Sequence, residues 1–183
     1  MRCALVVGHK ESSPGAENKA AKITEYEFNN EFVKHIEHFF RKSGQVELTV
    51  VHRDMYAKLP HDINKLHPQF VISLHCNAFN CIASGTEVLY WHKTRNGNIL
   101  AKFLQDNIVN TLNIPDRGIK PRDLSSRGGG LLKRTNAPCV IAEPFFIDNS
   151  NDLGTALRRY DELVNAYIRT IYQFNKYLSG GCG

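Results

Sequence analysis

The stretch that decides the fold is Val71-Ile72-Ser73-Leu74-His75-Cys76-Asn77-Ala78, a short and mostly apolar run that ends on a histidine. The run is too short for a helix and is typical of a buried strand. A similar run, Leu5-Val6-Val7-Gly8-His9, opens the chain. Ligands gather at the carboxyl ends of strands in open α/β sheets, so two strands that each deliver an imidazole favour a functional site at that edge. Either histidine taken alone could equally be a hydrogen-bonded core residue.

The composition of the 183-residue chain is that of one globular domain, with an ordinary hydrophobic share of 42%. Its apolar runs are far shorter than a membrane span, and the run after Arg2 lacks the length and the cleavage site of a signal peptide. The five cysteines form no C-x-x-C pair, which suits free thiols in a reducing compartment. We therefore expect synthesis in the cytoplasm, with no signal peptide and no membrane anchor.

The charge of the chain is mildly basic, at a formal +5. This surplus is compatible with an anionic polymer as a partner, although many proteins carry it for solubility alone. Basic and acidic residues are interleaved, and no helix-turn-helix, zinc-finger or RNP pattern is present. We therefore do not expect nucleic acid as a partner.

Strands and helices alternate along the chain, which favours an α/β fold with a largely parallel sheet. The expected strands cover 2–7, 45–51, the opening stretch, 85–91, 131–133 and 139–143. The expected helices cover the stretch from Thr24 to Gly44, the short turn 62–66, the stretch 99–112 and a final region capped near Asn149. The segment 115–130, rich in Arg, Lys and Gly, is expected to be irregular.

The first expected helix directs attention to Glu25. Thr24 and Glu27 have the spacing of a capping box, which gives Glu27 a structural role. The apolar stripe of this helix is Phe28, Phe32, Ile36 and Phe39. Three residues before Phe28, Glu25 continues that buried face, where a carboxylate is costly unless a metal or an arginine meets it. The alternative is that Glu25 lies in solvent at a frayed first turn.

Two imidazoles and one carboxylate from separate elements form a ligand set found in catalytic zinc sites, with a fourth position left for water. His9, His75 and Glu25 supply such a set. A further carboxylate, Glu143, ends the expected strand 139–143 and could act as a proton shuttle. No compact metal motif such as H-E-x-x-H is present.

These residues lie in blocks that resemble the zinc-dependent N-acetylmuramoyl-L-alanine amidases of type 3, found in phage endolysins and bacterial wall-remodelling enzymes. The resemblance covers nearly the whole chain, and its blocks occur in the family's order. They are Gly8-His9 with Pro14-Gly15-Ala16, Glu25 with Asn29, His52-Arg53-Asp54, Ser73-x-His75-x-Asn77-Ala78, Arg117-Gly118-Ile119 and Pro138 to Asn149.

The resemblance implies that His9, Glu25 and His75 bind zinc and that Glu143 is the essential acid/base. It implies a twisted sheet with helices on both faces, and cleavage of the amide between N-acetylmuramic acid and L-alanine in peptidoglycan, which degrades the cell wall. Lys10, Val6-Val7 and Pro144-Phe145 depart from the family's usual residues, so the surroundings of His9 and the shape of the groove are expected to differ.

The candidates for gripping the substrate are Asn77, Arg117, Lys120 and Arg122, because cations in the segment 115–130 could hold carboxylates of the stem peptide. Each of these cations could equally be part of a solvated basic loop. Two other functions remain open. One is a zinc peptidase or carboxypeptidase, and the other is a non-catalytic wall-binding or polyanion-binding domain whose structural zinc takes His52 or His92 as its fourth ligand.

We expect one catalytic domain over 1–178, a flexible tail over 179–183 and no separate wall-binding domain. The expected enzyme is a monomer made in the cytoplasm that reaches the wall only after release, through a holin if the chain is phage-encoded.

Overall fold

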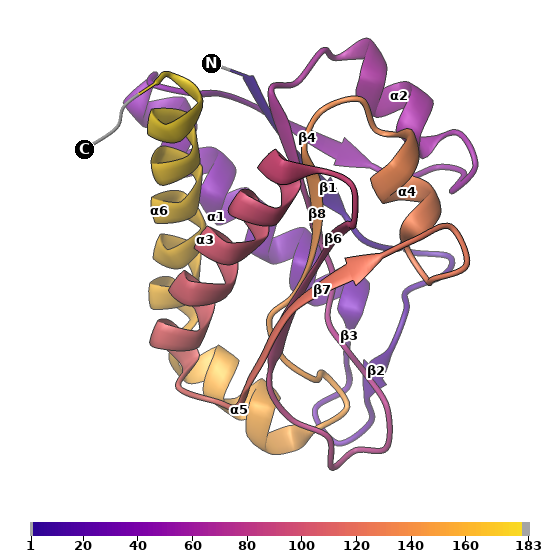
Figure 1. Ribbon diagram of the computed structural model, residues 1–183. Helices are drawn as coiled ribbons and strands as arrows, with labels where there is room; N and C mark the ends of the chain where they lie inside the picture. Colours follow the sequence, from indigo (N-terminus) through magenta and orange to yellow (C-terminus); the bar gives the residue numbers. More distant parts are fainter. Residues whose placement is uncertain (1, 181–183) are drawn as a thin grey trace.

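A six-stranded central sheet organises the chain in the computed structural model, which describes residues 2–180 (Figure 1). The strands lie in the order β4-β1-β5-β8-β6-β7. Their bounds are β1 (Arg2–Val7), β4 (Glu47–His52), β5 (Phe70–Leu74), β6 (Thr86–Trp91), β7 (Asp116–Arg122) and β8 (Cys139–Glu143). Two short strands, β2 (Glu17–Asn18) and β3 (Ile23–Thr24), pair with each other outside this sheet.

The pairing within the sheet is parallel at every step except between β6 and β8. The carboxyl ends of β1, β5 and β8 therefore lie at one edge, and the antiparallel β6 begins there. In this register Glu87, near the start of β6, is paired with Glu143 at the end of β8. The largely parallel α/β sheet expected from the sequence is confirmed, and it gathers the strand-end residues at one edge.

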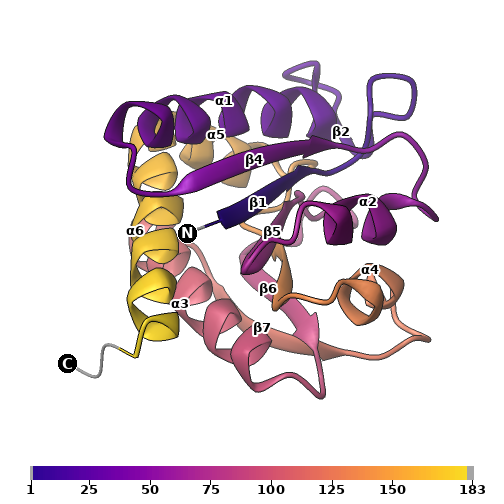
Figure 2. The ribbon, with the colours of Figure 1, turned by 90° about the horizontal axis from the view of Figure 1, so that it is seen from above.

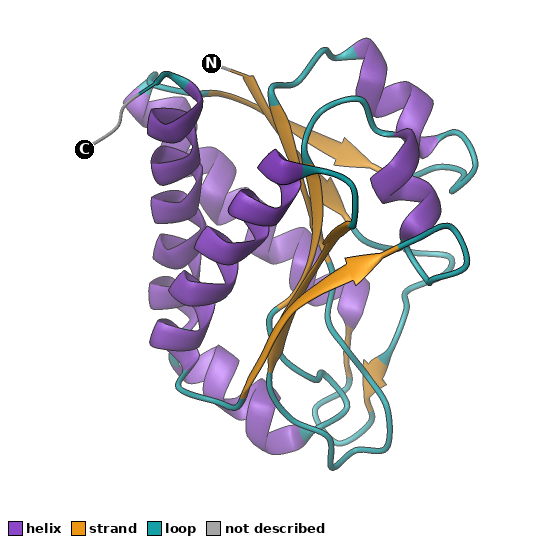
Figure 3. Ribbon diagram, viewed as in Figure 1, coloured by secondary structure: helices purple, strands orange, loops and turns teal. Residues whose placement is uncertain are grey.

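Helices cover both faces of the sheet, as Figures 2 and 3 show. One face carries α1 (Glu25–Ser43), α3 (Arg95–Leu112) and α6 (Tyr160–Leu178), with α5 (Ser150–Arg158) leading into α6. The other face carries α2 (Leu59–Lys65) and α4 (Gly129–Arg134). Each face has its own buried core, and the core under α1, α3 and α6 is the larger one.

The ends of α1 follow from its sequence. The Thr24 side chain caps the amide of Glu27 while the Glu27 side chain accepts from the Thr24 amide, so the predicted capping box is confirmed. Gly44 ends the helix at φ 64°. The predicted stripe is wrong at its last residue, because Phe39 is 38% exposed whereas Phe40 is 1% exposed. The buried stripe advances by four residues at each step, so position 40 faces the sheet.

Two other predictions about local structure were wrong, both near the edge of the sheet. The segment 115–130 is not irregular throughout, since β7 occupies Asp116–Arg122 beside β6. An edge strand pairs on one side only and therefore tolerates polar side chains and Pro121, which lacks an N–H donor. Residues 131–133 belong to α4 rather than to a strand, and Gly128, the N-cap residue before that helix, adopts the left-handed conformation at φ 81°.

None of the helices in residues 2–180 is both long and apolar enough to cross a membrane. Of the predicted tail 179–183, the positions 181–183 lie outside the described residues.

Candidate metal centre

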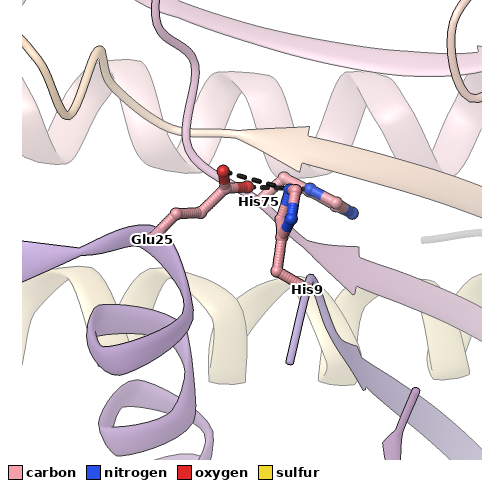
Figure 4. A group of neighbouring side chains, drawn as sticks. All are labelled: His9, Glu25 and His75. Atoms are coloured by element: carbon pink, nitrogen blue, oxygen red, sulfur yellow. Dashed lines mark hydrogen bonds and ion pairs between the residues drawn. The ribbon is translucent and has the colours of Figure 1, made fainter. Parts of the chain in front are cut away.

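Three separate elements deliver the side chains of the candidate metal centre, as Figure 4 shows. His9 follows the carboxyl end of β1, His75 follows that of β5, and Glu25 is the first residue of α1. The ligand atoms of the three side chains all lie within 4.8 Å of one another. The predicted convergence of two histidines on Glu25 is therefore present in the fold.

Glu25 is buried at the centre of this group, with 2% of its surface exposed. Its Oε1 lies 2.8 Å from His75 Nδ1 and accepts a hydrogen bond of 3.0 Å from the amide of Cys76. Its Oε2 lies 3.2 Å from His9 Nε2 and accepts a 3.3 Å bond from the amide of Ala16. The interpretation of Glu25 as a frayed, solvated residue is therefore wrong, because the loop before α1 and the end of β5 hold its carboxylate inside.

Two glycines let the backbone approach this group closely. A Cβ on Gly8 would lie 2.3 Å from the carbonyl oxygen of Leu74 and 2.7 Å from His75 Cε1. A Cβ on Gly15, whose φ is +85°, would lie 2.5 Å from Glu25 Oε2. His9 itself adopts φ 66°, a conformation that is uncommon outside glycine and is often found at functional sites. The surroundings therefore fix the three side chains tightly.

The protonation of the group is set by burial and by mutual contact. Burial lowers the pKa of His9, and this outweighs the opposing charge of Glu25. Burial alone would lower the pKa of His75, but the hydrogen bond with Glu25 and the charges of Glu143 and Glu25 raise it above its usual value. Burial would raise the pKa of Glu25, yet the contacts with His75 and His9 hold it below the usual range. Glu25 is therefore an anion between two imidazoles.

The donor set fits a zinc ion. Two imidazoles and a carboxylate within reach of one point are the ligand types that catalytic zinc sites use. His9 Nε2 is buried, and its 3.2 Å contact with Glu25 Oε2 lacks the geometry of a hydrogen bond, so within residues 2–180 this nitrogen is free to bind a metal. No fourth His, Cys, Asp or Glu joins this group within residues 2–180, and neither His52 nor His92 belongs to it. A metal held here would keep an open position.

Glu143 lies beside the centre without joining it. It lines the same cavity as His9 and His75, a space of about 180 Å³. One of its carboxylate oxygens, Oε2, is buried and makes no hydrogen bond with residues 2–180. Burial raises the pKa of Glu143 to about 7, with the charges of Glu25 and Glu87 acting in the same direction. A carboxyl group with this pKa can both accept and donate a proton near neutral pH.

The four residues predicted to grip the substrate lie in different surroundings. Asn77 and Arg122 line the cavity, whereas Arg117 and Lys120 are not among its lining residues within 2–180. Arg117 Nε pairs with Glu87 Oε2 at 2.9 Å, and its guanidinium lies 5.0 Å from the ring centroid of Phe146. Lys120 lies on β7 opposite Leu89. The structure thus brings Asn77 and Arg122 to the metal centre and engages Arg117 elsewhere.

Sequence reasoning missed four charged or aromatic residues that line the cavity: Arg53, Tyr56, Glu87 and Arg127. Glu87 accepts a 3.2 Å hydrogen bond from Asn77 Nδ2 and pairs with Arg117 and Arg122, the latter at 3.9 Å. The signal for Glu87 was weak, because a carboxylate inside an apolar strand can point to either face. Arg53 stood in a quoted block without a role, and Arg127 lay in a segment expected to be irregular.

Comparisons with known proteins identify the family of the chain. The Amidase_3 family model, described as N-acetylmuramoyl-L-alanine amidase, matches residues 3–173. An uncharacterized cell wall amidase of Bacillus anthracis is 34% identical over 89 residues, which cover 44% of this chain and 16% of that protein. The chain thus spans a small part of that relative. The uncharacterized protein YqiI of Bacillus subtilis is 26% identical over 150 residues, covering 79% of this chain and 69% of its own.

Solved structures share the fold at low sequence identity. An N-acetylmuramoyl-L-alanine amidase from Clostridium difficile 630 superposes with a TM-score of 0.83 at 21% identity, covering 96% of both chains. The catalytic domain of CwlV from Bacillus (Paenibacillus) polymyxa gives a TM-score of 0.84 at 17% identity, covering 96% of this chain and 98% of that one. With nearly its whole length matched by the family model, the chain belongs to the Amidase_3 family of N-acetylmuramoyl-L-alanine amidases and hence to the amidase class of hydrolases.

Proposed function

We propose that this chain is a zinc-dependent hydrolase that cleaves the amide between N-acetylmuramic acid and L-alanine in peptidoglycan. The observation that carries the proposal is the convergence of the ligand atoms of His9, Glu25 and His75 within 4.8 Å of one another, with Glu143 lining the same cavity as the two histidines. Family membership supports the bond and the substrate. Cell wall degradation would follow from cutting the link between glycan strands and their peptides.

The chain's own residues can divide the work of this reaction. Zinc, when bound, would supply a water of lowered pKa and a Lewis acid for the scissile carbonyl. His9, Glu25 and His75 would hold the metal and orient it towards the cavity. Glu143, with its pKa raised to about 7, would take a proton from the attacking water and return it to the leaving amine of L-alanine.

The test is digestion of purified peptidoglycan followed by mass analysis of the soluble products. We expect free stem peptides that begin with L-alanine, together with uncut glycan strands. The activity should disappear with a chelator and return with zinc. Glycan strands that keep L-alanine while the peptides are shortened would instead identify the zinc peptidase or carboxypeptidase.

The non-catalytic alternative needs a closed zinc site. It required His52 or His92 as a fourth ligand, and the group within residues 2–180 has three members that include neither. The open position and the raised pKa of Glu143 favour a catalytic role. Binding to the wall with no release of peptide, with or without zinc, would support the alternative.

The biological setting belongs to the same proposal. The cell wall amidase of Bacillus anthracis and an endolysin catalytic domain targeting Clostridia difficile, of TM-score 0.78, support the wall as the place of action. We infer a single catalytic domain over 1–178 that acts as a monomer once it reaches the wall. Sedimentation of the purified protein would check the monomer.

A further inference from the structure

The cavity beside the metal centre has a basic wall, formed by Arg53, Arg122 and Arg127. Arg122 has an anionic neighbour, because one of its nitrogens lies 3.9 Å from Glu87 Oε1. Arg53 and Arg127 form no ion pair and donate no side-chain hydrogen bond within residues 2–180. Two guanidinium groups therefore line a small cavity without forming an ion pair to any residue between 2 and 180.

Both arginines line the same cavity as the side chains of the metal centre. The other lining residues of this cavity include His9, His75 and Glu143, and its volume is only about 180 Å³. A ligand held by Arg53 and Arg127 would therefore lie next to the position where the scissile amide must sit.

A comparison with Arg117 shows why Arg53 and Arg127 are the candidates for binding an anion. Arg117 is matched by Glu87 at 2.9 Å and packs on Phe146, so its guanidinium is already engaged. Arg53 lies near an aromatic ring instead, with its guanidinium 5.8 Å from the ring centroid of Tyr56. An unpaired guanidinium presents a fork of N–H donors that fits a carboxylate with two parallel hydrogen bonds.

We propose that Arg53 and Arg127 form a subsite for a free carboxylate on the peptide arm of the substrate. This inference rests on the proposed function and makes it more specific. The peptide arm of the substrate begins at the scissile amide. The carboxylates nearest to that amide are therefore within reach of the cavity, which also contains His9, His75 and Glu143. The enzyme would then prefer stem peptides whose carboxylate is free over those in which it is converted to an amide.

The test compares three synthetic N-acetylmuramoyl tripeptides: one with every carboxylate free, one amidated on its second residue and one amidated at its C-terminus. In the unaltered enzyme, amidation at one of the two positions should lower kcat/KM about tenfold, which corresponds to about 1.4 kcal/mol. The position that matters identifies the carboxylate. In Arg53→Gln and Arg127→Gln the free acid should fall to the rate of that amide, so the discrimination disappears.

The matched control is Arg95→Gln, which removes the same charge from an exposed residue at the start of α3. It should keep the full preference for the free acid. Zinc content and circular dichroism, measured on all three variants, should be unchanged and so exclude a general loss of structure. Equal rates on the three substrates in the unaltered enzyme, or discrimination retained in both cavity variants, would overturn the subsite while leaving the amidase function intact. Cleavage of none of the three would remove the proposed function and the subsite with it.

Discussion

The two walls of the cavity are built in different ways. The metal wall consists of His9 and His75, which line the cavity, and of the buried Glu25, which contacts both histidines from behind the lining. These residues stand at the ends of two central strands and at the start of a long helix. The basic wall consists of Arg53, Arg122 and Arg127, which come from the loop after β4, the edge strand β7 and the loop before α4. One wall rests on buried regular elements, and the other rests on the margin of the sheet.

The two walls also differ in burial and in the contacts that hold their side chains. Backbone amides hold both oxygens of Glu25, and the side chains of His9 and His75 are only 15% and 17% exposed. On the other wall the Arg122 side chain is 31% exposed and Arg127 is exposed. A site for chemistry needs fixed geometry, whereas a charge that attracts a carboxylate tolerates movement. Losses from mutation should therefore be largest on the metal wall.

The largest loss of activity is expected when a residue of the metal wall is replaced. Replacing His9, Glu25 or His75 with alanine removes one of three protein donors, so zinc content and amidase activity should fall together to background. Elemental analysis and peptidoglycan digestion measure the two quantities. His35→Ala, on the exposed side of α1, should keep both. A Glu25→Ala protein with full zinc and full activity would show that the ligand set is wrong.

A smaller loss is expected at Glu143, which lies between the two walls. Glu143→Ala should keep its zinc and its fold while kcat falls by about a hundredfold or more, the usual scale for removing a general acid/base. Zinc analysis alongside kinetics separates this result from that of the ligand variants. If Glu143→Ala loses its metal, the two glutamates have been assigned the wrong way round.

The metal wall could be predicted from the sequence because its residues follow strong local patterns. Apolar runs place His9 and His75 at strand ends, and the helical stripe that begins at Phe28 places Glu25 on the buried face of α1. Parallel strands bring such ends to one edge of the sheet, so the convergence follows from topology. The resemblance to the amidase family added the roles of these residues.

The basic wall could not be predicted in the same way. The edge strand β7 carries polar residues and Pro121, so its sequence lacks the alternation of a half-buried strand and hid the place of Arg122. Arg53 and Arg127 lie in loops, and the direction of a loop side chain depends on tertiary contacts rather than on periodicity. Glu87 forms the ion pairs with Arg117 and Arg122. It lies on β6, and the strands next to β6 are known only from the strand order of the sheet.

The pH dependence of amidase activity tests the raised pKa of Glu143. Glu143 must be a carboxylate to take a proton from water, and its pKa is raised to about 7. Activity should therefore fall as the pH drops below this value, by about tenfold per pH unit well below it. The positive charge of bound zinc moves the midpoint to lower pH, so we expect a midpoint at or below about 7. A kcat/KM that is flat from pH 5 to 8 would contradict the role of Glu143.

The smallest effect is expected at Glu87, which joins the two walls. Glu87 accepts from Asn77, two residues after His75, and pairs with Arg117 and Arg122 on the other side. Its charge also raises the pKa of Glu143, so Glu87→Gln should move the midpoint of the pH profile to lower pH. The amide can still accept from Asn77 but no longer neutralises the arginines, so kcat/KM should fall by less than about tenfold while zinc is retained.

Glu31→Gln, which alters an exposed ion pair on α1, is the control and should leave both the rate and the midpoint unchanged. A Glu87→Gln profile that keeps its midpoint, or moves it to higher pH, would show that the two walls act independently and that Glu87 only anchors β7.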